Sequence, residues 1–513
     1  MLEKTPNLDF YQEMVVDLIV EQDLVKGVVT SLGLKIFGKS VILTNGTFLN
    51  GLIHIGEKNF GGGRAGEKAA VGLTTSLENL GFESGRMKTG TPPRVDGRSL
   101  DYTKMQEQPG DVTPSKFSFS DLTKPLTRQL SCHITHTNLD VHDILRSGFD
   151  RSPMFNGAIQ STGPRYCPSI EDKINRFSDK SQHQIFVEPE GWTTVEMYVN
   201  GFSTSLPEDI QDKAIRSVAG FENVKFLRYG YAIEYDYFPP TQLTHSLETK
   251  RIKNLFFAGQ INGTTGYEEA AAQGLVAGLG AACKLLDRPM PAMDRTNSYI
   301  AVMIDDLTLQ GVTEPYRMLT ARAEYRLRLR SDNAHTRLTP LAIEAGAVGT
   351  DRMDAFNHRE QMKATALDMM SAHISADVLM KQGVPVKPDA GKMSKLEWLR
   401  FPHVSIMDLL EADRAEWPRE LLLEIEQDGR YAPYLARQEA EIQDIAANEK
   451  ITLASNVDYA AIAGLSNEMV EKLQSAKPEN LAAASRLRGI TPAALAAILV
   501  HAKRARSAVT EAA

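Results

Sequence analysis

A thiol, two cations and an expected helix start lie together in one short run of the sequence. The run reads Gly163-Pro-Arg-Tyr-Cys-Pro-Ser-Ile-Glu-Asp-Lys173, so that Cys167 directly precedes a proline. Proline is favoured in the first turn of a helix, and we expect a helix to begin here. Backbone amides at a helix start, with Arg165 and Lys173 nearby, lower the pKa of a thiol and increase its nucleophilic thiolate fraction. Cys167 is therefore the candidate nucleophile; the alternative is a buried, inert cysteine, the commoner fate of this residue type.

A glycine-rich turn between a strand and a helix is a second candidate site. Residues 258–266 read Ala-Gly-Gln-Ile-Asn-Gly-Thr-Thr-Gly, between an apolar strand expected at 254–259 and an Ala-rich helix expected at 267–286. Glycine has no Cβ, so a ligand can approach the backbone closely. The start of the helix favours an anionic or electron-rich ring such as reduced flavin. The alternative is a plain strand–helix crossover, but three glycines and two threonines are more than packing requires.

The run Ser131-Cys-His-Ile-Thr-His-Thr137 contains residue types that bind metals. In an extended strand Cys132, Ile134 and His136 share one face. Two ligands on a face are too few for a closed zinc site, which takes four. We therefore predict a polar strand that lines a pocket, and no metal site. Cys283 lies mid-helix among Ala and Leu, and we predict that it is part of the core.

The stretch 316–330 is rich in arginine and tyrosine although the protein is acidic. Its arginines are Arg317, Arg322, Arg326, Arg328 and Arg330. Guanidinium groups pair with phosphates and tyrosine rings stack on bases, so these arginines are predicted to contact nucleic acid. The alternative is a solvated charged face, the usual role of a charge run.

The elements that must position these sites are strands in the N-terminal part and helices after about residue 291. The first strands are expected at 15–21, 25–30, 34–37 and 39–47. Gly61–Gly66 formally satisfies the G-x-G-x-x-G dinucleotide fingerprint, but the residues before it are polar. A glycine-rich approach to a helix near 67–80 is favoured instead.

Composition limits the class of protein. A length of 513 residues predicts several domains. A net charge of −8 means that nucleic acid can be bound only by local patches. Three cysteines cannot form a disulfide framework and fit a reducing cytosol. The sequence has no long apolar run and no signal-like start, so we expect a soluble cytoplasmic protein without a membrane segment.

These motifs together resemble the MnmG (GidA) family of tRNA uridine 5-carboxymethylaminomethyl modification enzymes, over essentially the whole chain. The matching runs are Gly62–Gly66, Lys88–Arg94, Cys132–Thr137, Gly163–Lys173, His183–Phe186, Glu188–Gly191, Tyr231–Asp236, Ala258–Gly274 and Arg322–Arg326. The resemblance implies an α/β fold: an FAD-binding Rossmann-like domain of the two-dinucleotide-binding type, with an inserted α/β domain and a C-terminal all-helical region. The implied parts are 1–98 and 222–290 for the FAD-binding domain, 99–221 for the inserted NAD/substrate domain, 291–435 for a helical domain, and 436–513 for a helical domain that binds tRNA and partner.

The resemblance also implies a reaction. Family members modify the wobble uridine of certain tRNAs at C5, with FAD, NADH, a methylene-tetrahydrofolate carbon, and glycine or ammonium. They work with the GTPase MnmE in a heterotetramer, and a homodimer is implied. A thiolate that adds to the pyrimidine ring would make C5 nucleophilic, and Cys167 matches one of two functional cysteines of the family.

Cofactor contacts are implied by position in the family's motifs. For FAD they are Val15, Ala70, Gly259 and Gln260; some relatives carry serine where Ala70 stands, so only a backbone contact is expected there. The assigned NAD region matches Gly163, Pro164, Arg165, Tyr166, Cys167, Pro168, Ser169, Ile170, Glu171, Asp172, Lys173, Ile174, Asn175, Arg176 and Phe177.

One departure from the family leaves alternatives open. Relatives carry a further N-terminal segment with the first strand, the pyrophosphate turn and another functional cysteine, so we expect the working enzyme to be longer than this chain. A folate-dependent tRNA uridine methyltransferase that makes ribothymidine shares the flavin scaffold but lacks the long helical region seen at 291–513. A non-catalytic fragment that binds tRNA or the GTPase is the third alternative.

Overall fold

Two units make up the chain in the computed structural model. The described residues are 2–120, 123–163, 168–410, 417–449, 451–454, 457–487 and 489–511, with the backbone alone described at 444–449, 492 and 503–511. The first unit comprises residues 1–117, 123–285 and 311–317, and the second comprises 118–122, 286–310 and 318–513. No helix among the described residues is long and apolar enough to cross a bilayer.

The first unit begins with the hairpin that alternating apolar residues predicted. Strand β1 (Val15–Glu21) pairs antiparallel with β2 (Leu24–Thr30), and β2 pairs with β3 (Lys35–Phe37). The tight connection at Gln22 and Asp23 has positive φ at both residues, as two-residue hairpin turns require. The predicted strands at 15–21, 25–30 and 34–37 are thus confirmed.

A parallel pair of strands forms the centre of the second candidate site. Strand β4 (Val41–Leu43) lies parallel to β15 (Leu255–Phe257), whose residues are fully buried. Helix α5 (Tyr267–Leu285) follows β15 after the glycine-rich turn, and places Cys283 in the core. The predicted strand, turn, helix and core cysteine are confirmed here.

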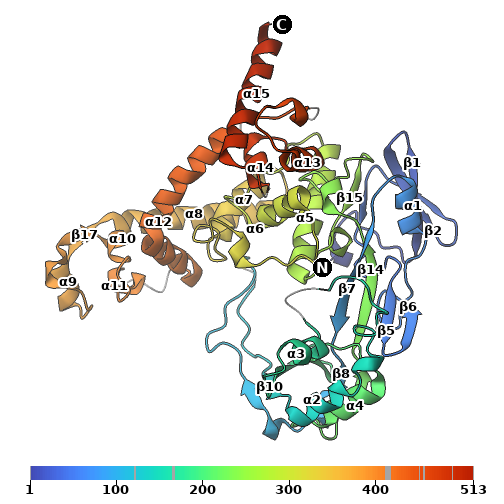
Figure 1. Cartoon of the computed structure of the whole chain (residues 1–513). Coiled ribbons are helices and arrows are strands. Elements are labelled where there is room, and N and C mark those ends of the chain that lie inside the picture. Colours follow the sequence, from blue (N-terminus) through green and yellow to red (C-terminus); the bar gives the residue numbers. More distant parts are fainter. Residues whose placement is uncertain are drawn as a thin grey trace. The chain divides into compact units, whose positions relative to one another are not determined.

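Two antiparallel sheets complete the first unit (Figure 1). The four-stranded sheet has the order β6 (Lys58–Gly61), β5 (Leu52–Ile55), β14 (Tyr231–Tyr237), β7 (Gly85–Thr91). The six-stranded sheet has the order β13 (Phe226–Arg228), β8 (Arg94–Asp96), β12 (Glu196–Asn200), β11 (Gln184–Pro189), β10 (Cys132–His136), β9 (Gln106–Gln108). Its apolar core is shared with helices α2 (Leu139–Arg146), α3 (Ile170–Arg176) and α4 (Glu208–Arg216).

The glycine run does not lead into a helix. Strand β6 is an exposed strand that ends at Gly61, Arg64 and Glu67 then pair across a tight turn, and helix α1 (Leu73–Asn79) begins only at Leu73. The dinucleotide fingerprint is therefore excluded at this position, since it needs a buried strand that leads directly into a helix. The expected helix near 67–80 is correspondingly shorter.

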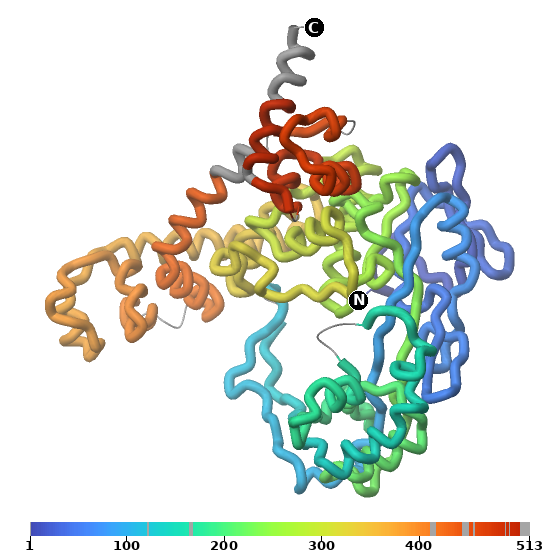
Figure 2. Tube along the Cα trace, viewed as in Figure 1, coloured from blue at the N-terminus to red at the C-terminus, as the bar shows by residue number. Residues whose placement is uncertain are grey.

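The second unit is helical, as the composition after residue 291 predicted (Figure 2). Its helices are α6 (Tyr299–Asp305), α7 (Ala334–Glu344), α8 (Thr350–Ser371), α9 (Ala376–Lys381), α10 (Lys395–Trp398), α11 (Ile406–Leu409), α12 (Arg419–Glu449), α13 (Asn467–Ala476), α14 (Leu481–Arg486) and α15 (Pro492–Glu511). The apolar cores among its described residues include one around the buried Trp398, one around Leu473 and a smaller one around Val302 and Tyr325. A short antiparallel pair of strands, β16 (His373–Ser375) and β17 (Lys392–Ser394), adjoins the first core, with helix α9 in the connection between them. The sequence did not predict this pair.

Candidate functional site

The turn after β15 has a backbone shape that only glycine adopts readily. Gly259 has φ 87° and ψ −144°. A Cβ at this position would make ordinary van der Waals contact with Ala270 at 3.7 Å, so backbone conformation, and not lack of space, is what favours glycine here. The turn therefore provides a bare peptide surface at the start of α5, which suits close approach of a ligand.

The side chain of Gln273, on α5, fixes the turn. Its Oε1 accepts hydrogen bonds from the Gly259 amide at 3.1 Å and from Asn262 Nδ2 at 2.8 Å. Its Nε2 donates to Thr264 Oγ1 at 2.9 Å, and Thr264 Oγ1 donates to the Gly259 carbonyl at 3.1 Å. These hydrogen bonds therefore connect the turn to helix α5.

A second turn lies at the same edge of the parallel strand pair. Asn45 and Gly46 follow β4 as the glycine-rich turn follows β15, and carboxyl ends of parallel strands meet at one edge, where nucleotides bind in open α/β sheets. A Cβ on Gly46 would lie 3.7 Å from Gln260 Oε1. Buried oxygens of Asn45, Asn262 and Thr265 have no hydrogen-bond partner among the described residues. Open backbone and unsatisfied polar atoms fit a polar, ring-containing cofactor such as FAD.

The other two residues expected to contact FAD are Ala70 and Val15. Ala70 donates its amide to the Phe48 carbonyl at 2.8 Å, and its carbonyl accepts from the Asn50 amide at 3.0 Å, so its backbone is already used. A Cβ on Gly72 would lie 3.2 Å from the carbonyl oxygen of Val16, next to Val15 at the start of β1. These contacts place Ala70 beside Phe48 and Asn50, and Gly72 beside Val16 on β1.

Within the expected NAD region, Gly163 and Pro168–Phe177 are described, whereas Pro164, Arg165, Tyr166 and Cys167 lie outside the described residues. Helix α3 begins at Ile170, two residues later than the predicted start at Pro168, because Ser169 Oγ accepts from the Asp172 amide at 3.2 Å and caps the helix there. The side chains of Ile170, Glu171 and Ile174 are buried. The side chains of Asp172 and Lys173 are partly exposed, and those of Asn175, Arg176 and Phe177 are exposed.

A hollow of about 400 Å³ adjoins the solvent side of α3. Pro168, Lys173 and Phe177 line it from the expected NAD region, and His183, Gln184, Phe186, Asn200 and Gly201 line it from β11, β12 and the adjoining turns. Lys173 Nζ donates to the Gly201 carbonyl at 3.0 Å. Burial, and then the charge of Lys173, lower the pKa of His183, so its imidazole is neutral at pH 7. The lining combines aromatic rings, a cation and a neutral imidazole.

The five arginines of 317–330 have different surroundings. Arg317 belongs to the first unit, and its Nε lies 3.4 Å from Glu269 Oε1 at the start of α5. In the second unit Arg330 is mostly buried between Asp332 and Asp428, Arg328 pairs with Glu439, and Arg322 lies 3.8 Å from Asp306. The remaining arginine, Arg326, is exposed and has no ion pair with the described residues.

The stretch from 316 to 330 is neither one helix nor one strand. It contains a short 3-10 turn at Thr320–Arg322 followed by further turns. The segment therefore offers no single helix or strand face for these arginines, and Arg326 is the exposed one without an ion pair among the described residues.

The strand with Cys132 is internal to the six-stranded sheet. Burial, and then Glu188, raise the pKa of Cys132, so this thiol is not an activated nucleophile. Among the described residues no group of three or more His, Cys, Asp or Glu side chains is arranged to hold a metal.

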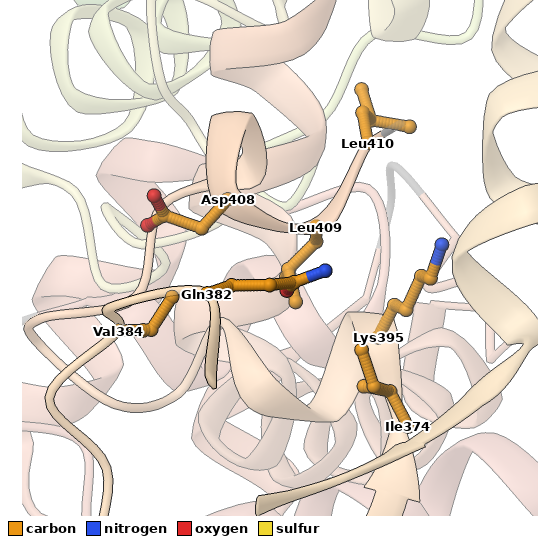
Figure 3. Close-up of a pocket in the computed structure, with 7 residues that line it drawn as sticks. All are labelled: Ile374, Gln382, Val384, Lys395, Asp408, Leu409 and Leu410. Atoms are coloured by element: carbon orange, nitrogen blue, oxygen red, sulfur yellow. The ribbon is translucent and has the colours of Figure 1, made fainter. Parts of the chain in front are cut away.

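A separate cavity of about 190 Å³ lies in the second unit, next to the core around Trp398 (Figure 3). Its polar lining residues are Gln382, Lys395 and Asp408, and the others are apolar. Asp408 already accepts hydrogen bonds from the amide and hydroxyl of Ser405 as part of a helix cap. We assign no ligand to this cavity.

The likeness to known proteins covers nearly the whole chain. The family model described as glucose inhibited division protein A matches residues 1–289. Two models described as tRNA modifying enzyme MnmG/GidA C-terminal helical domain and C-terminal helical bundle match residues 350–439 and 441–513. The tRNA uridine 5-carboxymethylaminomethyl modification enzyme MnmG of Christiangramia forsetii is 55% identical, over 98% of this chain and 82% of its own length. This chain belongs to the MnmG (GidA) family.

Further MnmG relatives agree. The enzyme of the same name from Flavobacterium johnsoniae is 57% identical over 92% of this chain and 78% of its own length. The crystal structure of Aquifex aeolicus GidA in form II has a TM-score of 0.87 and 42% identity, over 98% of this chain and 81% of the GidA chain. The predicted fold class, an α/β FAD-binding fold followed by helices, is confirmed by this likeness.

The sequence did not predict the residues on β11, β12 and the adjoining turns that line the hollow beside α3. His183 and Phe186 belong to a motif that supported the family resemblance, but neither was singled out as a site residue. The signal was available in part, because His183 and Gln184 open the alternating strand β11. Asn200 gave no signal, since only the pairing of β12 with β11 brings it to the hollow.

Proposed function

We propose that this chain belongs to an enzyme that catalyses the FAD-dependent modification of the tRNA wobble uridine at C5, with a carboxymethylaminomethyl or aminomethyl group as product. The observation that carries the proposal is the likeness to MnmG along 98% of the chain, both C-terminal helical regions included. Those regions disfavour the folate-dependent uridine methyltransferase, which resembles this family only in its flavin scaffold. The tRNA substrate is named in the family's own description.

FAD would be held at the edge of the β4–β15 pair. The backbone of Gly259 would offer close approach, Gln260 and the unsatisfied oxygens of Asn45 and Thr265 would offer hydrogen bonds, and Val15 and Ala70 are further proposed contacts. When bound, FAD supplies a ring that accepts a hydride from NADH and passes electrons to the one-carbon transfer. Gln273 would hold the turn in this conformation before the cofactor binds.

NADH would bind in the hollow beside α3. Phe177 and Phe186 can cover the face of a flat ring, Lys173 supplies positive charge for a phosphate, and neutral His183 can donate or accept a hydrogen bond. Methylene-tetrahydrofolate is the proposed carbon donor.

Cys167 is the proposed nucleophile. Its thiolate would add to the pyrimidine ring and make C5 nucleophilic towards the one-carbon unit. The proposed assembly is a cytoplasmic homodimer that works with the GTPase MnmE in a heterotetramer. The C-terminal helices and Arg326 are proposed to contact tRNA.

The experiment is nucleoside mass spectrometry on tRNA from a bacterium that lacks its own MnmG. We expect the wild-type chain to restore the modified wobble uridine, and Cys167→Ser to fail although it still folds and binds flavin. Cys132→Ser is the matched control, a thiol with raised pKa, and should restore the nucleoside. Restored ribothymidine with no wobble modification would favour the methyltransferase. Binding of tRNA by a folded wild-type chain without any nucleoside change would favour the non-catalytic alternative.

A further inference from the structure

Residues 311–317 belong to the first unit, although the chain on both sides of them belongs to the second. They pair with the glycine-rich turn before α5. The Tyr316 amide donates to the Gly263 carbonyl at 2.9 Å, and the Tyr316 carbonyl accepts from the Thr265 amide at 3.0 Å. The backbone of this segment therefore runs along the turn, and Arg317, the next residue, lies beside the start of α5.

The first turn of α5 carries a buried carboxylate against this arginine. The Glu269 side chain is 2% exposed, and its Oε1 lies 3.4 Å from Arg317 Nε. A Cβ on Gly266, which has φ 127°, would overlap Glu269 Oε2 and would lie 3.2 Å from Arg317 Nε. The carboxylate therefore lies directly against the backbone of the glycine-rich turn, with the guanidinium group beside it, and only glycine at 266 leaves room for both.

A carboxylate at this position has two opposite effects. It favours α5, because a negative charge at the start of a helix interacts well with the helix dipole. It disfavours a cofactor at the same end of the helix, because FAD carries a negatively charged pyrophosphate and its ring gains electron density when it is reduced. Like charges repel more strongly where burial excludes water. A cation against Glu269 reduces this repulsion, and Arg317 supplies one.

We propose that Arg317 is a positioning residue of the FAD site, which holds the Glu269 carboxylate against Gly266 and offsets its charge beside the reduced ring. The inference rests on the proposed FAD site at the edge of the β4–β15 pair. This role differs from the nucleic-acid contact that the sequence predicts for Arg317, and the test separates the two. An ion pair with a structural role alone would affect oxidised and reduced FAD alike.

The test compares Arg317→Met, which leaves the carboxylate unpaired, with Glu269→Gln, which removes the carboxylate and keeps the arginine. Two quantities are measured on the whole chain: the Kd for oxidised FAD, by fluorescence titration, and the midpoint reduction potential of bound FAD. We expect Arg317→Met to weaken binding of reduced FAD about tenfold more than that of oxidised FAD, which lowers the potential by about 30 mV for a two-electron couple. Glu269→Gln should raise the potential and should not weaken binding of oxidised FAD, because it removes the negative charge.

Arg228→Met is the matched control, because Arg228 is similarly exposed and pairs with Glu196 at 3.2 Å in the six-stranded sheet of the same unit. It should leave the Kd and the potential unchanged.

An unchanged potential in Arg317→Met, or weaker FAD binding by Glu269→Gln, would overturn the inference and leave a structural ion pair. Loss of tRNA affinity in Arg317→Met with unchanged FAD binding would also overturn it, in favour of a nucleic-acid contact. If Arg317→Met does not fold, Glu269→Gln decides, because an ion pair with a structural role alone predicts weaker FAD binding there. A folded wild-type chain that binds no FAD refutes the proposed FAD site itself, whereas FAD binding by the wild type with no effect of either variant refutes this inference alone.

Discussion

Replacement of Arg330 and Arg326 by alanine, one at a time, separates a structural arginine from one that is free to bind a polyanion. The Arg330 side chain is 11% exposed and donates to Asp332 at 3.0 Å and to Asp428 at 2.5 Å. Arg326 lies four residues earlier in the sequence and is exposed. The two substitutions remove the same charge from the same stretch of chain.

The expected effect of Arg330→Ala is on folding. Loss of one partner from a buried ion pair destabilises by about 3–5 kcal/mol. Asp332 and Asp428 are about a third exposed, and solvent screening reduces this to about 2 kcal/mol. For a unit of this size that lowers Tm by about 4–8 °C, which calorimetry measures. Affinity for tRNA should change little at a temperature where the variant is folded.

The expected effect of Arg326→Ala is on binding. Stability should stay within about 0.5 kcal/mol, as for surface substitutions in general. The Kd for tRNA should rise about three- to tenfold, or about 0.7–1.4 kcal/mol. The slope of log K against log salt should fall by about 0.7–0.9 for the lost phosphate contact. The reasoning is refuted if Arg330→Ala weakens tRNA binding at unchanged Tm, or if Arg326→Ala leaves both Kd and the salt slope unchanged.

Three further predictions concern the turn, a buried carboxylate and the inserted sheet. Gly259→Ala should lower the free energy of unfolding by about 1–3 kcal/mol from backbone strain alone and weaken FAD binding, measured by denaturation and fluorescence titration; Gly274→Ala, an open helical position, is the control. Burial would raise the pKa of Glu424, but hydrogen bonds from Lys363 and Arg359 hold it below its usual value. The wild type should therefore lose stability as the pH falls below about 4.5, and Glu424→Gln should show a smaller loss over that window in denaturant titrations; an equal loss would contradict this. Leu145→Ala, in the core of the inserted sheet, should cost about 2.7–5 kcal/mol without loss of flavin, and a cost below 1 kcal/mol would show that this core is loosely packed.

Local signals in the sequence were enough for the elements around the flavin turn. The apolar run before Gly259 and the Ala-rich run after it predicted β15 and α5 with nearly correct ends, because a buried strand and a long helix each have a strong pattern. The strand pair β16–β17 was missed because a strand of three residues is too short to show an alternating apolar pattern. The helix expected near 67–80 begins only at Leu73, after a turn closed by Arg64 and Glu67.

Long-range pairing is what the sequence could not provide. No local signal in the sequence distinguishes Arg330 from the neighbouring arginines, because its partner Asp428 is 98 residues away. The contact of His54 with Glu234 spans 180 residues. Lys88 was part of a recognised motif, but its burial against Gly163 depends on how β7 and residues 161–163 meet. Residue type and spacing therefore identified the chemistry of the segments, and tertiary contacts decide which side chains are free to perform it.

Flavin binding by the purified chain tests whether the edge of the β4–β15 pair is an FAD site. The chain is mixed with FAD, passed through a gel-filtration column, and its visible absorption spectrum is recorded, with Gly259→Ala in parallel. We expect a flavin absorption band to stay with the wild-type protein in stoichiometric amount, and to be weaker in Gly259→Ala. A wild-type chain that is folded by circular dichroism but leaves the column without flavin would contradict the proposed FAD site.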